Sequence, residues 1–283
     1  MKTKPILILF FCTILLGFAS DNGDNKFYHI PARTIDFSKQ WGYERYQFKF
    51  KTSIEEFDIS SLVTYSQYKT YLKDIKVDSS TKFYQSQLPD TGMCNKDVYE
   101  KYVSSSEYDT YPVLGITWEA AMNYCKWMTL KENKDSLVYM YCLPTYTQWI
   151  DAYEYLKSIN NTGDLNNDYS DWLLTPNDEG TYFIKNEVDS NSTTIAYLSL
   201  NDKTDAPVLR RKMIAGNSFL FLLDYSMNYY YHYYGYSDRG YRQVGFRYVK
   251  HKIRWPVTIQ KPAYMVGKYD YKVLQYWGLK KSK

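Results

Sequence analysis

The chain has few of the residues on which metal sites and nucleophilic sites depend. It has four cysteines and three histidines in 283 residues, and no cysteine follows Cys142. It contains no Cys-x-x-Cys pair and no cysteine–histidine cluster, so the sequence gives no sign of a zinc site. The net charge is only +4, which excludes a strong electrostatic case for binding nucleic acid or an anionic membrane.

Long apolar runs are also missing, apart from one at the N-terminus. Residues 1–20 combine the basic residues Lys2 and Lys4 with an apolar stretch over Ile6–Leu16 and small residues at the end. This is the pattern of a cleaved signal peptide, and the apolar run is short for a bilayer span. Cys12 lies inside the run, unlike a lipoprotein cysteine. We therefore expect an exported protein (periplasmic, outer-membrane-associated or secreted) with no membrane span in the mature chain.

Tyrosine, in contrast, is abundant, with 33 residues. Its apolar ring and polar tip suit half-buried strands and binding surfaces, although a general bias of composition is an alternative reading. Eight tyrosines fall within Asp224–Tyr241, and we predict a binding surface there; the alternative is that half of these tyrosines pack inward. The candidate surface residues are Tyr225, Asn228, Tyr229, Tyr231, His232, Tyr234, Tyr236, Asp238 and Arg239.

Two blocks within Tyr111–Tyr155 have the pattern of capped helices that each follow an extended segment. In the first block, Thr117 is placed to cap a helix, and apolar residues follow at helical spacing over Ala120–Met128. In the second block, Thr145 is placed to cap a helix whose buried stripe includes Trp149. We expect these two helices to build much of the core.

Weaker patterns predict the secondary structure of the remaining segments. Alternation over Tyr43–Phe57 predicts one or two strands, and the apolar stripe of Ser60–Lys76 predicts a helix. Val113–Ile116 is predicted to be a short strand. The polar stretches Asp21–Gln40 and Ser79–Thr110 are predicted to be a loose arm and a surface loop.

The residue identities in the two central blocks are more specific than their periodicity. P-V-x-G-I-T-W-E-A-A-x-x-Y-C-K-W, followed by Y-x-L-P-T-Y-T-Q-W-x-x-A, resembles the signature of the formylglycine-generating-enzyme, or sulfatase-modifying-factor, family. Weaker blocks at Asp164–Leu174, Arg210–Phe219 and Val244–Val249 follow in the order of the family. The resemblance covers roughly Tyr43–Lys250.

This resemblance implies an α+β class with the C-type-lectin-like sulfatase-modifying-factor fold. Such a fold has two packed helices, small antiparallel sheets and much irregular loop. The expected organisation is a signal peptide (1–20), an N-terminal arm (21–42), a sulfatase-modifying-factor-like domain (43–250) and a C-terminal extension (251–283).

The same resemblance argues against the family's copper chemistry. Active members hold copper through two cysteines, which lie two and seven residues after the aromatic residue that ends the G-G-S-[WY] block. That aromatic residue is Phe219 here, so the two positions are Phe221 and Ser226. Neither can bind copper as a thiolate. We therefore expect no copper cofactor, no catalytic residue and a divergent pseudoenzyme, in which Cys142 also replaces the family's Arg.

Two further expectations follow from the family's pattern. Asp168 and Asp171 occupy the places of an Asn and a Glu that support a structural calcium ion, and carboxylates are ligands that calcium takes; the alternative is a solvated acidic turn. The two signature blocks should pack together, so Cys125 and Cys142 are the first candidates for a disulfide. The alternative is that both, like Cys94, are reduced and buried.

These observations favour an exported, non-catalytic binding or scaffold module in a bacterial envelope or surface assembly of the gliding or type 9 secretion kind. Its partner would be an envelope or cell-surface protein, or a glycan. One alternative is an enzyme with altered chemistry on the same face, with Asp224, His232, Asp238 and Arg239 as its titratable groups. The other is a variable ligand-binding receptor of the retroelement-diversified type.

Overall fold

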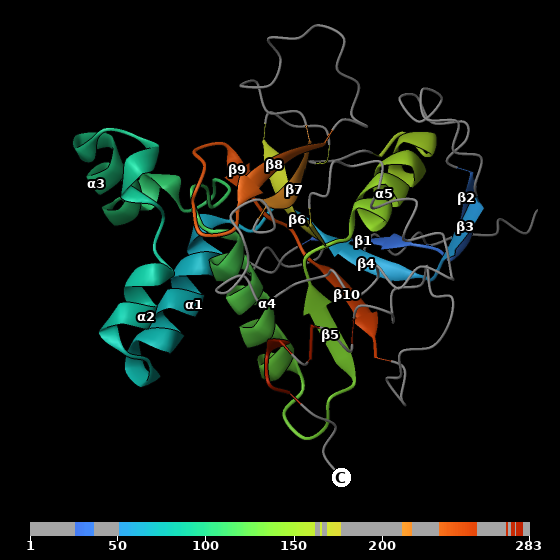
Figure 1. Cartoon of the computed structure of the whole chain (residues 1–283), viewed down its shortest axis with the longest axis horizontal. Coiled ribbons are helices and arrows are strands. Elements are labelled where there is room, and N and C mark those ends of the chain that lie inside the picture. The colour runs from blue at the N-terminus through green and yellow to red at the C-terminus, as the bar shows by residue number, and fades with distance from the viewer. Residues whose placement is uncertain are drawn as a thin grey trace, which may run out of the picture.

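The computed structural model describes residues 26–36, 51–161, 165, 169–176, 211–216, 232–253, 270, 273–274 and 276–279 (Figure 1). In these residues, two four-stranded sheets, one two-stranded sheet and several helices make an α+β architecture, as the sequence predicts. In the described part of the chain, no helix combines the length and the apolar character needed to cross a membrane.

The first sheet joins strands from both ends of the chain. Its order is β1 (Phe27–Ile30), β4 (Phe57–Ser60), β10 (Val249–Lys252) and β5 (Tyr139–Cys142), and all its pairs are antiparallel. Val249 in β10 pairs with Ile59 on one side and with Cys142 on the other. The second signature block therefore begins beside the strand that ends the family's pattern.

The other sheets are smaller and more irregular. The second four-stranded sheet has the order β8 (His232–Tyr236), β7 (Arg211–Gly216), β6 (Ser170–Pro176) and β9 (Val244–Gly245), and only the β6–β9 pair is parallel. Strands β2 (Arg33–Asp36) and β3 (Lys51–Ile54) form a separate antiparallel pair.

Both signature helices begin where the sequence predicts. Helix α4 (Trp118–Glu132) is capped by Thr117, whose side chain accepts the backbone N–H of Ala120. Helix α5 (Tyr146–Ser158) is capped by Thr145 in a reciprocal capping box with Gln148. Helix α4 contacts β5 and α1, whereas α5 contacts β1, β6 and β7 (Figure 1).

Tyrosine serves as a core residue as well as a surface residue. Tyr68 and Tyr71 of helix α1 (Tyr65–Asp78) lie against Tyr124 of α4, with ring centroids 5.8 Å and 5.5 Å from that of Tyr124. Both α1 hydroxyls donate to Gln87, Tyr68 to the backbone carbonyl at 2.7 Å and Tyr71 to the side-chain oxygen at 2.9 Å. These bonds satisfy the polar tips in the core, and burial raises the pKa of Tyr68 and Tyr71.

Three local predictions are wrong. The arm predicted at 21–40 contains β1 and β2, and 113–116 forms no strand of its own. The loop predicted at 79–110 is largely helical, because Ser80, Asp90, Asn95 and Ser105 each cap a short helix with their side chains. Those helices are α2 (Thr81–Ser86), η3 (Thr91–Met93), α3 (Lys96–Ser104) and η4 (Ser106–Tyr108).

Candidate functional site

The described half of the tyrosine-rich run is a strand and a turn rather than a loop. Tyr234 lies in β8 with 47% of its surface exposed, and Tyr236 at the end of the strand is half-buried. Asp238 and Arg239 follow in the turn, and both are exposed. We call Tyr234, Tyr236, Asp238 and Arg239 the β8 surface.

Two contacts orient Tyr236 and Arg239 of the β8 surface. The Arg239 guanidinium carbon lies 5.2 Å from the centre of the Tyr236 ring, which is a cation–π distance. The Tyr236 backbone N–H donates to the Tyr241 hydroxyl at 3.0 Å, and the Tyr241 ring packs edge-on against the buried Trp172. The surface thus presents an oriented guanidinium beside aromatic rings, which suits stacking and hydrogen bonding to a ligand.

The turn after β8 is fixed to the helical segment 79–110. Asp90 accepts the backbone N–H of Gly240 through Oδ2 at 3.2 Å and donates its own N–H to the carbonyl of Gly115 at 2.7 Å. A Cβ atom at position 240 would lie 1.8 Å from the Gly115 carbonyl oxygen, so this close approach requires glycine. The helical segment therefore borders the β8 surface.

Part of the predicted surface falls outside the described residues, namely Tyr225, Asn228, Tyr229 and Tyr231. His232 is the first residue of β8 and pairs with Ala215 through the backbone. For the alternative enzymatic set, Asp224 is likewise outside the described residues. The structure thus brings Tyr234, Tyr236, Asp238 and Arg239 together on one strand and turn.

A buried ion pair joins Asp171 of β6 to Arg247. The Asp171 Oδ2 atom accepts hydrogen bonds from Trp149 Nε1 at 2.9 Å and from Arg247 Nε at 2.7 Å. The Asp171 and Arg247 side chains are almost fully buried. The sequence singled out Asp171 but missed Arg247, although Arg247 belongs to the G-F-R block.

This arrangement gives Asp171 a structural partner, which the calcium prediction did not foresee. Asp168, the other predicted ligand, lies outside the described residues. The calcium site therefore stays a prediction, which calorimetric titration of Ca²⁺ into the wild type and an Asp168→Ala variant would test.

The predicted Cys125–Cys142 disulfide is not formed in the structure. Cys125 and Cys142 are buried and Cys94 is half-buried, and all three thiols are free. Cys125 lies on α4 and Cys142 on β5, two elements in contact. Burial raises the pKa of both buried thiols, so they are held as thiols rather than thiolates.

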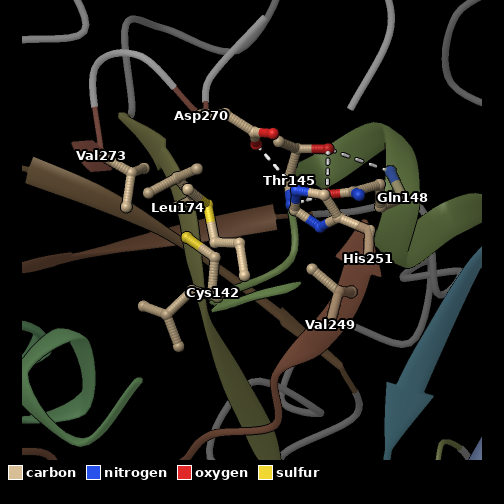
Figure 2. A pocket seen from close by; sticks show the side chains of 10 residues that line it. Cys142, Thr145, Gln148, Leu174, Val249, His251, Asp270 and Val273 are labelled. Carbon is tan, nitrogen blue, oxygen red and sulfur yellow. Dashed lines mark hydrogen bonds and ion pairs between the residues drawn. The ribbon is translucent and has the colours of Figure 1, made fainter. Parts of the chain in front are cut away.

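A small cavity lies between α5, β10 and the C-terminal residues (Figure 2). His251 of β10 and Asp270 form its polar side, with 2.7 Å between His251 Nε2 and Asp270 Oδ1. Gln148 and Cys142 also line it. This pair could not be predicted from the sequence, because His251 and Asp270 belong to no recognisable motif.

Comparison with known proteins agrees with the signature blocks. The family model of the sulfatase-modifying factor enzyme 1-like domain matches residues 43–205. The chain belongs to this family. The match confirms the family that the sequence resembles, and the α+β fold agrees with it.

Several solved structures are similar, at low sequence identity. The crystal structure of CarF is 13% identical with a TM-score of 0.47, and the match covers 82% of this chain and 100% of that one. PvdO from Pseudomonas aeruginosa is 12% identical with a TM-score of 0.46, covering 81% and 95%. Variable protein 1 of Treponema denticola is 11% identical with a TM-score of 0.42, covering 80% and 94%. No curated protein matches the chain in sequence.

Proposed function

We propose that this member of the family is a non-catalytic binding module that recognises an envelope or cell-surface protein through its β8 surface. The observation that carries this proposal is the loss of the copper-binding thiolates. Phe221 and Ser226 stand at the two copper positions. Cys125 and Cys142 are buried thiols with raised pKa values, so they are poor substitutes.

The chemistry of the β8 surface supports a protein partner. Tyrosine and arginine are enriched in the residues that dominate binding energy at protein interfaces. Tyr234 is exposed, and Arg239 is stacked on Tyr236, so the side chains are partly ordered before a partner arrives. A preorganised surface loses less conformational entropy on binding.

The same proposal includes the cellular compartment in which the protein acts. Residues 1–20 have the pattern of a signal peptide, and no described helix is suited to span a membrane. The module would then act outside the cytoplasm, as a component of an envelope or surface assembly of the gliding or type 9 secretion kind.

Co-purification tests the proposal directly. The tagged full chain is recovered from envelope extracts, and bound proteins are identified by mass spectrometry. Arg239→Ala and Tyr234→Ala should each reduce the recovery of a defined partner at least about tenfold, as expected for hot-spot residues. Tyr139→Ala is the matched control, because Tyr139 is also partly exposed but lies in β5 of the other sheet.

The possible results separate the alternatives. A protein that elutes alone, or a partner that persists in both β8 variants, would contradict the proposal. Release of the chain by a free glycan would assign the surface to a sugar instead. Oxidation of a cysteine-containing sulfatase peptide by the protein with added copper would show that the family's chemistry survives.

A further inference from the structure

The cavity in Figure 2 lies where the C-terminal residues meet the second signature block. Val273, Leu274 and Trp277 are buried, and Lys126 of α4 donates to the Trp277 carbonyl at 2.9 Å. Asp270 adds the hydrogen bond with His251, whose side chain is 6% exposed. The described residues of 270–279 are therefore packed on the domain through apolar and polar contacts.

Three of the residues that line the cavity each have one buried polar atom with no hydrogen-bond partner among the described residues. These atoms are Gln148 Nε2, His251 Nδ1 and Asp270 Oδ2. An unsatisfied buried polar group costs about 1–3 kcal/mol. Three such groups around one cavity point to a bound ligand that satisfies them.

The orientation of each group is set by its other contacts. The Gln148 side-chain oxygen accepts the Thr145 N–H at 2.9 Å, so the Gln148 amide nitrogen remains available as a donor. The Asp270 carboxylate accepts from His251 Nε2, so its second oxygen is left as an acceptor. The remaining nitrogen of His251 is an acceptor in the neutral ring and a donor in the charged ring.

This mixture of groups selects the chemical class of the ligand. A metal cation would meet the Gln148 N–H group, and an anion would meet the Asp270 carboxylate. Water both donates and accepts two hydrogen bonds, so it matches the three groups in either protonation state of His251. The centre of a water molecule can occupy about 10 Å³ of the cavity, so there is room for one water molecule.

We propose that Gln148, His251 and Asp270 hold one structural water molecule. The water accepts from Gln148 Nε2 and bonds the free atoms of His251 and Asp270. It links helix α5, strand β10 and the C-terminal residues into one hydrogen-bonded junction. The C-terminal residues are then an integral part of the domain.

A crystal structure of the full chain at high resolution tests the site itself. We expect a water oxygen within about 3.2 Å of Gln148 Nε2 and of at least one of the other two atoms. A cavity without density, or one that refines as an ion, would overturn the proposal.

A pair of near-isosteric substitutions tests the link to the C-terminal residues. Gln148→Glu keeps the oxygen that caps α5 but replaces the donor by an acceptor, whereas Asp270→Asn keeps an oxygen for His251 but replaces the acceptor by a donor. Each single variant should speed hydrogen exchange of the Trp277 amide, which donates to the Val273 carbonyl at 2.9 Å, by about tenfold. The double variant restores one donor and one acceptor, so we expect exchange within about threefold of wild type.

Val273→Ala supplies the control, because Val273 lines the same cavity without a hydrogen-bonding group. The factors by which Val273→Ala and Gln148→Glu speed exchange of the Trp277 amide should multiply in the double variant, and neither should cancel the other. If the factors for Gln148→Glu and Asp270→Asn also simply multiply in their double variant, no water couples the two residues and the proposal is wrong.

Discussion

Arg247 Nε lies 2.7 Å from Asp171 Oδ2, and the two side chains are 1% and 3% exposed. The two residues are 76 positions apart in sequence. Arg247 also donates to the Ser60 carbonyl at 3.3 Å, and Ser60 ends a strand of the other large sheet. The pair therefore ties β6 of one sheet to β4 of the other.

Removing one partner of this pair should be strongly destabilising. Asp171→Asn removes the negative charge that lies 2.7 Å from the buried Arg247 guanidinium, so we expect a loss of about 3–5 kcal/mol in the free energy of unfolding. Urea denaturation measures it. Glu107→Gln breaks the exposed Lys101–Glu107 pair and should give no measurable change. Equal effects of the two substitutions would show that the buried pair has no special role.

A second buried carboxylate should make stability depend on pH. Burial raises the pKa of Asp151 from its ordinary value of 3.8 to about 6, against the opposing effect of Arg33. The unfolded chain therefore ionises first as pH rises, and stability is lost between about pH 4 and 6. The rise in pKa corresponds to about 3 kcal/mol.

Asp151→Asn removes this titration. We expect the variant's unfolding free energy, measured by urea denaturation from pH 4 to 7, to lack that part of the decline. The Arg33 side chain is 30% exposed, so water can solvate it in the variant. A wild type and variant with parallel pH profiles would contradict the raised pKa.

The three described cysteines should differ in reactivity. Cys94 is half-buried, whereas Cys125 and Cys142 are buried with raised pKa values. Under native conditions, iodoacetamide should label the Cys94 peptide first and label the other two only after unfolding. Peptide mass spectrometry checks this order. Recovery of Cys125 and Cys142 as one disulfide-linked peptide pair would restore the sequence-based prediction of a disulfide.

The turn that carries Arg239 should not tolerate a side chain at Gly240. A Cβ atom added at position 240 would lie 1.8 Å from the Gly115 carbonyl oxygen, which is a backbone atom. We expect Gly240→Ala to cost about 1–3 kcal/mol, measured by thermal or urea unfolding. Gly92→Ala should cost less, since its nearest neighbour, the Asp90 Oδ1 atom, would lie 3.2 Å from the added Cβ and needs only a small shift.

The sequence predicted the parts of the fold that depend on local signals. Thr117 and Thr145 cap their helices as expected, because a cap needs only residues three positions apart. The helices within 79–110 were missed because their composition is polar and few of their residues are buried; α2 buries none and α3 buries only Tyr102. A run of consecutive tyrosines likewise hides the alternation that would have indicated β8.

The candidate site was predictable only in part. Tyr234, Tyr236, Asp238 and Arg239 were chosen for their residue types, and the structure places them together. The partners Arg247 and Asp90 were not predictable, because each contact joins segments at least 76 residues apart. The cavity around His251 was not predictable either, because His251 and Asp270 belong to no recognisable motif and Gln148 comes from a distant segment.

The order of strands in the first sheet has a consequence for biogenesis. β4 is completed on one side by β10, which the ribosome makes almost two hundred residues later. A chain that emerges gradually cannot close this sheet, and such distant pairings form slowly. The first sheet should therefore stay incomplete until synthesis is nearly finished, so the last step of folding has to follow the synthesis of β10.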